Sequence, residues 1–147
     1  SLGDSLGLYR ALRELRMADS AELAAHTGLN ERWLREWLRH QACMGQIEHD
    51  AASDRFYLSP EAVAVLVDTT HPAYFGGGFE SATASFGSLP GLVESFRSGL
   101  GFAYDDHGPG CASGIERMTR YFNEFTLVPK VLPLLDGVVD KLERGVA

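Results

Sequence analysis

The first 43 residues carry apolar side chains at helical spacing in three successive segments. In residues 5–16, leucine and tyrosine side chains share one face, while arginine and glutamate side chains cover the other. Ser20 is expected to cap a second helix that ends at Gly28, and Asn30 to cap a third helix that continues to Cys43. The sequence therefore predicts three short helices, and a tight turn separates the last two.

Two short segments of alternating side chains follow the third helix. Residues 46–50 and residues 55–59 alternate apolar and polar positions, and a four-residue connection joins them. Ser59 then precedes Pro60, which is typical of a helix start, because serine caps the helix and proline suits its first position. We therefore expect a two-stranded hairpin followed by a fourth helix.

The residues around the tight turn indicate a winged helix-turn-helix. Ala24 is small enough for the second and third helices to approach each other, and Gly28 supplies the backbone freedom of the turn. Leu34 and Trp37 occupy the core positions of the third helix. The order of elements predicts a mainly α fold with a two-stranded wing, and a winged-helix domain over residues 1–70.

The composition changes after Asp68, where aromatic residues and glycines become frequent. Further helices are predicted at residues 72–86, 88–98, 111–127 and 136–144. These helices do not close a core of their own, so we expect their aromatic faces to meet another domain. Residues 71–135 are interpreted as an aromatic-rich helical linker and substrate lid. Residues 136–147 are interpreted as a lead-in helix to a cofactor-binding domain.

Three successive glycines, Gly76 to Gly78, fall inside the first of these later helices. A glycine in a helix interior costs about 1 kcal/mol relative to alanine. Either the helix breaks there or a neighbour packs very close, and the sequence favours the break. The glycines do not form a nucleotide-binding loop, because no buried strand precedes them.

Composition narrows the classes of function. Apolar residues make up 45% of the 147 residues, which is enough to form a buried core. The net charge is −7, and this negative charge disfavours a protein that binds nucleic acid through its phosphates. The apolar runs are too short to cross a bilayer and no secretory signal is recognisable, so we expect a cytoplasmic protein without membrane contact. Cys43 and Cys111 are interpreted as buried thiols in a reducing compartment, and no metal site is predicted.

The third helix carries three arginines, Arg32, Arg35 and Arg39, on one face. On a free-standing winged helix this face would enter the major groove, so DNA binding is the alternative function. Neighbouring glutamates could equally neutralise the arginines. Trp33 and Trp37 widen the apolar arc of the same helix. Either one tryptophan packs in the core and the other lies on a surface that contacts a partner, or the first helix covers both tryptophans.

The stretch Gly99–Gly110 holds the most chemically varied side chains. Asp105, Asp106 and His107 could be metal ligands or an acid/base pair, although adjacent loop residues rarely converge on one ion. A mobile lid that presents Tyr104 to a ligand fits the pattern better. The sequence has no nucleophile elbow, zinc-protease motif or phosphate-binding loop, so the catalytic residues stay unknown.

Several runs of residues resemble the N-terminus of certain bacterial class I S-adenosylmethionine-dependent methyltransferases. The resemblance covers nearly the whole chain and lies in these runs: Asp4-Ser5-Leu6-Gly7-Leu8-Tyr9-Arg10-Ala11-Leu12, Glu22-Leu23-Ala24, Thr27-Gly28-Leu29-Asn30-Glu31-Arg32, Arg35-Glu36-Trp37-Leu38, Phe56-Tyr57-Leu58-Ser59-Pro60-Glu61 and Tyr104-Asp105. The stretch from Asn30 to Arg39 is the most specific part. In that family a winged helix serves dimerisation and substrate enclosure, a helical linker follows, and a doubly wound α/β domain binds the cofactor.

The resemblance implies a homodimer that encloses a small, apolar or aromatic methyl acceptor. It places Tyr104 and Asp105 against the cofactor, and it places four phenylalanines around the substrate: Phe75, Phe79, Phe122 and Phe125. Ordinary core packing is the alternative for these phenylalanines. The first strand and glycine loop of the cofactor domain should begin at residues 145–147. The catalytic α/β domain is therefore expected to be absent from this chain, which alone should not bind S-adenosylmethionine. The alternative is a winged-helix transcription regulator with a small-ligand pocket.

Overall fold

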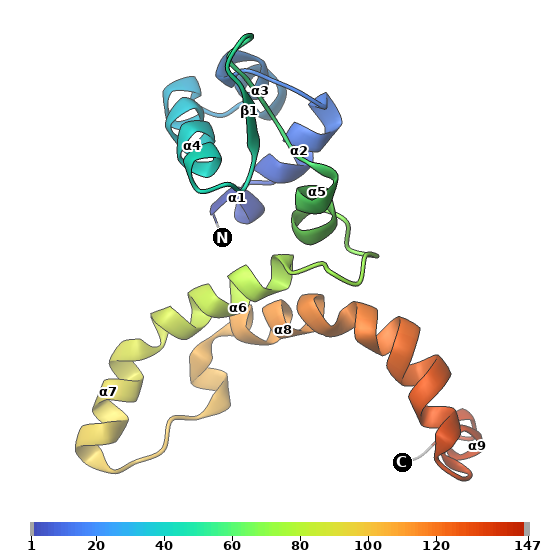
Figure 1. Ribbon diagram of the computed structural model, residues 1–147. Helices are drawn as coiled ribbons and strands as arrows, with labels where there is room; N and C mark the ends of the chain where they lie inside the picture. Colours follow the sequence, from blue (N-terminus) through green and yellow to red (C-terminus); the bar gives the residue numbers. More distant parts are fainter. Residues whose placement is uncertain (1, 146–147) are drawn as a thin grey trace.

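The computed structural model describes residues 2–145 as a winged-helix unit followed by a group of longer helices (Figure 1). The winged-helix unit contains α1 (Leu2–Ser5), α2 (Leu8–Leu15), α3 (Ser20–Thr27), α4 (Glu31–Cys43), β1 (Glu48–Asp50), β2 (Arg55–Tyr57) and α5 (Pro60–Leu66). The helical part contains α6 (Gly76–Gly87), α7 (Leu89–Ser98), η1 (Tyr104–His107), α8 (Pro109–Phe122), η2 (Asn123–Val131), η3 (Leu132–Leu134) and α9 (Val138–Glu143). The mainly α fold with a two-stranded wing is confirmed. The expected start of a cofactor domain at Val146 and Ala147 lies outside the described residues.

The core of the winged-helix unit is built by leucines from three helices and a phenylalanine from the wing. Leu8 and Leu12 of α2, Leu23 of α3 and Leu38 of α4 are almost completely buried, and Phe56 of β2 packs with them. Burial of each such side chain contributes about 2 kcal/mol. This core fixes the position of α4 and leaves one face of it free.

The wing has a third partner that the sequence did not reveal. β1 and β2 pair antiparallel with His49 opposite Phe56. On the other side of β2, the backbone N–H groups of Ala18 and Phe56 each donate to the other residue's carbonyl oxygen, at 2.9 and 2.8 Å. A single bridging residue has no periodicity, so no pattern could have indicated it.

Two predictions about the first helices are wrong. The helix predicted over residues 5–16 begins only at Leu8, and residues 2–5 form the separate helix α1, because Gly7 adopts a φ of 68° between the two helices. The cap of α3 is Asp19 and not Ser20. The Asp19 carboxylate accepts from the backbone N–H of Glu22 at 2.8 Å, and the Glu22 side chain accepts from the backbone N–H of Asp19 at 3.0 Å. This reciprocal pair satisfies two free N–H groups at the helix start, which Ser20 alone would not.

The predicted third helix is confirmed, including its cap, where the Asn30 side chain accepts from the backbone N–H of Trp33. Trp37 is buried and packs against Tyr9, whereas the side chain of Trp33 is 71% exposed. One tryptophan therefore serves the core and the other is left on the surface. Cys43, predicted to be buried, is exposed at the helix end, whereas Cys111 of α8 is buried as predicted.

The successive glycines form the start of α6, so the helix predicted over residues 72–86 begins only at Gly76, and the close packing that the sequence disfavoured is also present. Gly76, Gly77 and Gly78 are all buried and helical. A Cβ on Gly77 would lie 2.3 Å from the carbonyl oxygen of Gly114, and a Cβ on Gly114 would lie 2.5 Å from the amide nitrogen of Ser81. The glycines therefore allow α6 and α8 to cross with their backbones in contact.

The outer ends of the helical part expose apolar side chains. Phe96 of α7 is 93% exposed, and Phe86, Phe122 and Val128 are also exposed.

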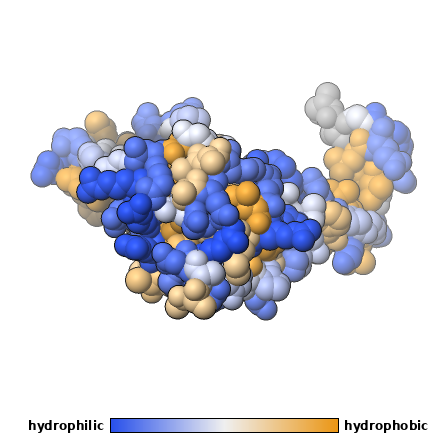
Figure 2. All heavy atoms as spheres, turned by 90° about the horizontal axis from the view of Figure 1, so that it is seen from above, coloured by the Kyte–Doolittle hydropathy of each residue, from blue (hydrophilic) through white to orange (hydrophobic). Residues whose placement is uncertain are grey.

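α8 continues into the π-helix η2, which contains Pro129. Proline has no N–H group to donate, so the regular series of helical hydrogen bonds is interrupted there. Figure 2 shows apolar residues gathered on the C-terminal arm, which extends away from the body. Within residues 2–145, no helix combines the length and the apolar character that a bilayer span requires.

Candidate functional site

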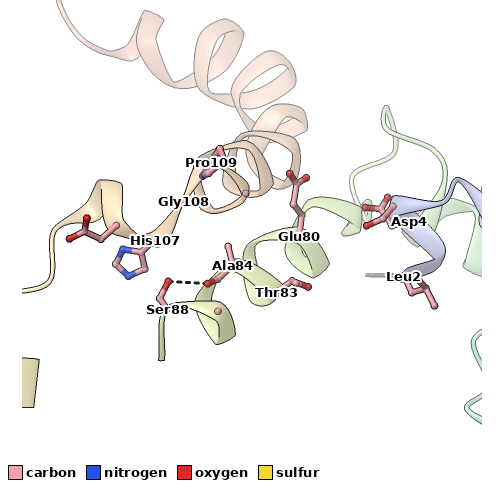
Figure 3. Close-up of a pocket in the computed structure, with 13 residues that line it drawn as sticks. Leu2, Asp4, Glu80, Thr83, Ala84, Ser88, His107, Gly108 and Pro109 are labelled. Atoms are coloured by element: carbon pink, nitrogen blue, oxygen red, sulfur yellow. Dashed lines mark hydrogen bonds between the residues drawn. The ribbon is translucent and has the colours of Figure 1, made fainter. Parts of the chain in front are cut away.

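A groove of about 610 Å³ runs along α6, from α1 at one end to η1 and the start of α8 at the other (Figure 3). This volume is typical of small-molecule sites in proteins. Its lining combines apolar side chains, carboxylates and one histidine: Leu2, Ala84, Pro109, Asp4, Glu80, Asp106 and His107. Both the winged-helix unit and the helical part contribute to the groove.

Arg117 of α8 holds the α1 end of the groove together. Its guanidinium group donates to the two carboxylate oxygens of Asp4 at 3.1 and 2.8 Å, to Glu80 at 2.7 Å and to the hydroxyl group of Tyr74 at 2.7 Å. Glu80 also accepts from the hydroxyl group of Ser113 at 2.5 Å. This cluster joins α1 to α6 and α8. Sequence reasoning missed it, because no pattern links residues more than a hundred positions apart.

The hydrogen bonds of the Arg117 cluster favour its charged forms. The bonds to Asp4, and then those to Glu80 and Tyr74, raise the pKa of Arg117. The bond from Ser113, followed by the bond from Arg117, lowers the pKa of Glu80. The cluster therefore joins the carboxyl groups of Asp4 and Glu80 to a single guanidinium group.

His107 lies at the other end of the groove, where its ring extends from η1 toward Ser88 at the end of α6 (Figure 3). Its Nδ1 lies 3.1 Å from the carbonyl oxygen of Tyr104. A carbonyl oxygen only accepts, so Nδ1 carries the hydrogen and Nε2 is an acceptor in the neutral ring. The ring of Phe102 meets the His107 ring edge-on at 4.8 Å and packs on Gly91, where a Cβ would lie 2.3 Å from it. These two contacts fix the ring of His107 in the groove wall and leave Nε2 without a hydrogen-bond partner within residues 2–145.

The two residues assigned to the cofactor, Tyr104 and Asp105, lie on η1 beside this acceptor but do not line the groove. The side chain of Tyr104 is 59% exposed, and its ring centroid lies 5.9 Å from that of His107. The next two residues, Asp106 and His107, form the wall instead. Among the described residues, no three histidine, cysteine, aspartate or glutamate side chains are arranged to hold a metal ion.

The four phenylalanines assigned to the substrate lie in two separate places. Phe75 and Phe79 meet edge-to-face at 5.8 Å, and Phe79 also packs against the winged-helix core. Phe122 and Phe125 lie at the junction of α8 and η2, where Phe125 stacks on Tyr121 at 4.8 Å. None of the four lines the groove, and their contact with a substrate stays a prediction.

The arginine face of α4 is exposed as predicted, but it is partly neutralised. Arg35 donates to both carboxylate oxygens of Glu31 at 2.7 and 2.8 Å. Arg32 lies over the ring of Trp33, 5.9 Å from its centroid. In the wing, Arg55 is paired with Glu22. The two ion pairs, Arg35 with Glu31 and Arg55 with Glu22, lower the positive charge that α4 and the wing could offer to a phosphate backbone.

Comparison with known families agrees with the N-terminal architecture. Residues 1–68 match the family model described as the Rv2258c-like winged HTH domain. This region is a winged helix-turn-helix. The match ends within the connection after α5, so it covers the winged-helix unit and not the groove wall formed by α6, η1 and α8. No curated protein matches the chain significantly.

Proposed function

We propose that this chain is the dimerisation and substrate-enclosing region of an S-adenosylmethionine-dependent methyltransferase that acts on a small acceptor in the cytoplasm. The observation that carries the proposal is the groove, because the winged-helix unit and the helical part form it together. A winged helix that served DNA alone would need no such groove against a following helical segment. The resemblance of the sequence to methyltransferase N-termini supports the same function.

The exposed apolar faces of the helical part support a role as a component of a larger assembly. Large side chains such as Phe96, Leu100 and Leu134 are mostly exposed. Exposed apolar surfaces of this kind mark interfaces. In the proposed function, a second copy and a cofactor-binding domain cover these faces.

The described residues do not by themselves fit S-adenosylmethionine. An α/β domain holds dinucleotide-type ligands at a glycine-rich turn between a buried strand and a helix. The two strands within residues 2–145 form the wing, and Tyr104 and Asp105 are exposed on a short turn. We therefore assign the cofactor to a separate α/β domain and derive no catalytic step from this chain.

The proposal is tested by reading the gene beyond the codon of Ala147 and by assaying its complete product. A following strand and glycine-rich turn, together with transfer of a labelled methyl group from S-adenosylmethionine to small acceptors, are the expected results. A complete product that lacks such a unit and binds one duplex DNA sequence tightly would overturn it.

The alternative, a transcription regulator, is favoured by the winged helix-turn-helix and by the exposed Arg32, Arg35 and Arg39. We rank it second because Arg35 is paired with Glu31 and the chain carries a net charge of −7. An electrophoretic shift series at increasing salt separates the two functions. Sequence-selective binding that is lost in Arg39→Ala would support the regulator.

A further inference from the structure

The groove along α6 has a polarity that restricts which molecules it can hold. His107 lines one end, and its bonded Nδ1 leaves Nε2 as the acceptor of the neutral ring; the carboxylates of Asp4 and Glu80 around Arg117 lie at the other end. Apolar surface lies between them, with Ala84 in the wall. A ligand that fits this arrangement has an apolar body and a hydrogen-bond donor at the His107 end.

The charges of the groove disfavour an anion. Asp4, Glu80 and Asp106 carry three negative charges, while Arg117, which bonds two of them, carries the one positive charge of the cluster. A carboxylate or phosphate ligand would meet like charge at both ends, and no unpaired cation lines the groove among residues 2–145. The occupant is therefore neutral or cationic.

The walls also suit a flat molecule. Gly87, Gly108 and Gly110 line the groove and present backbone without side chains, and Pro109 adds its rigid ring. An aromatic ring can lie against such a surface with little loss of rotamer freedom. The volume of about 610 Å³ accommodates a substituted single or double ring.

We infer that the groove binds a small hydroxyl-bearing aromatic molecule without negative charge, and that its hydroxyl group donates to Nε2 of His107. His107 is a positioning group for this ligand, and Phe102 and the carbonyl oxygen of Tyr104 fix its ring. That this ligand is the methyl acceptor rests on the proposed function. That the ligand binds in the groove is independent of the proposed function, because S-adenosylmethionine takes no part in the binding.

The test uses the chain of residues 1–147 and three simple probes: 4-ethylphenol, 4-ethylanisole and 4-hydroxyphenylacetate. The first carries the donor, the second replaces it with a methyl ether, and the third adds a negative charge. Loss of one hydrogen bond should weaken binding of the anisole by about three- to tenfold in calorimetric titration. The anionic probe, 4-hydroxyphenylacetate, should bind no more tightly than 4-ethylanisole. These comparisons use the unaltered protein, so they do not depend on whether a variant folds.

A second readout places the binding at His107. In ¹H–¹³C spectra of histidine-labelled protein, 4-ethylphenol should shift the ring resonances of His107 and leave those of His40, on the distant α4, in place. His107→Phe should weaken 4-ethylphenol binding by about three- to tenfold, while the matched His40→Phe should not. Equal affinity for the phenol and the anisole, or an unshifted His107 resonance at saturation, would overturn the inference. A failure of methyl transfer with intact phenol binding would instead count against the proposed function.

Discussion

The crossing of α6 and α8 allows a direct test of the packing that forms the groove, through the substitution Gly114→Ala. The new Cβ would lie 2.5 Å from the amide nitrogen of Ser81, 2.7 Å from the carbonyl oxygen of Gly77 and 3.0 Å from the Cα of Ser81. All three atoms belong to the backbone of α6. No side-chain rotation can therefore relieve the contact, and the two helices have to move apart.

Two opposing contributions determine the expected change in stability. Alanine is favoured over glycine within a helix by about 1 kcal/mol. Overpacking costs about 1 to 3 kcal/mol, and the upper end applies here because backbone atoms must separate along the whole crossing. Gly114→Ala should therefore lower the free energy of unfolding by about 2 kcal/mol, which corresponds to a decrease in Tm of about 6 °C for a chain of this size.

Gly87→Ala is the matched control, because Gly87 ends α6 and a Cβ at this position meets nothing within 4 Å. It should leave the stability unchanged or raise it by up to about 1 kcal/mol. Thermal unfolding followed by circular dichroism measures both variants. Amide hydrogen exchange across Gly76–Gly87 shows whether the loss is confined to the crossing. A Gly114→Ala variant as stable as Gly87→Ala would refute the close-packing argument.

Three further predictions concern the charged groups. Arg117→Ala should destabilise the protein by about 2 kcal/mol, because it leaves partly buried carboxylates unpaired. Arg120→Ala removes only an exposed i,i+4 pair with Glu116 and should have a much smaller effect, and chemical denaturation compares the two variants. The pKa of Glu80 is lowered in the folded protein, so its contribution to stability is complete above its unfolded pKa and is lost as the pH falls through the folded value. Tm measured from pH 6 to pH 3 should therefore fall less steeply in Glu80→Gln than in the unaltered protein. Duplex DNA should bind weakly at physiological salt, with a Kd no tighter than about 1 μM, and Arg39→Ala and Arg35→Ala should have similarly small effects in a gel-shift assay.

The winged-helix unit could be predicted because its signals are local. The turn at Gly28, the cap at Asn30 and the serine–proline start of α5 each depend on a few neighbouring residues, and the structure contains all three. The error at the start of α3 arose because two local signals competed. Asp19 and Ser20 are both good caps, and the choice depended on Glu22, which pairs with an aspartate cap at that spacing.

The groove could not be predicted because it depends on contacts between distant segments. Asp4 and Arg117 are 113 positions apart, and each residue alone is an ordinary charged side chain on a helix. The glycines of α6 did carry a signal, since three glycines within a helix imply either a break or a close neighbour. The sequence could not decide between these possibilities, because the neighbour, Gly114, lies on another helix.

The close crossing and the Arg117 cluster depend on each other, because both require α8 to lie against α6. Arg117 follows Gly114 by three residues on α8, so it lies about one turn from the contact with α6. Its bonds to Asp4 and Glu80, at 2.7 to 3.1 Å, are possible only while α8 lies close against α6. A Cβ at Gly114 that separates the helices should therefore also lengthen these bonds and release α1. It follows that Gly114→Ala should weaken phenol binding in the groove although Gly114 does not line it.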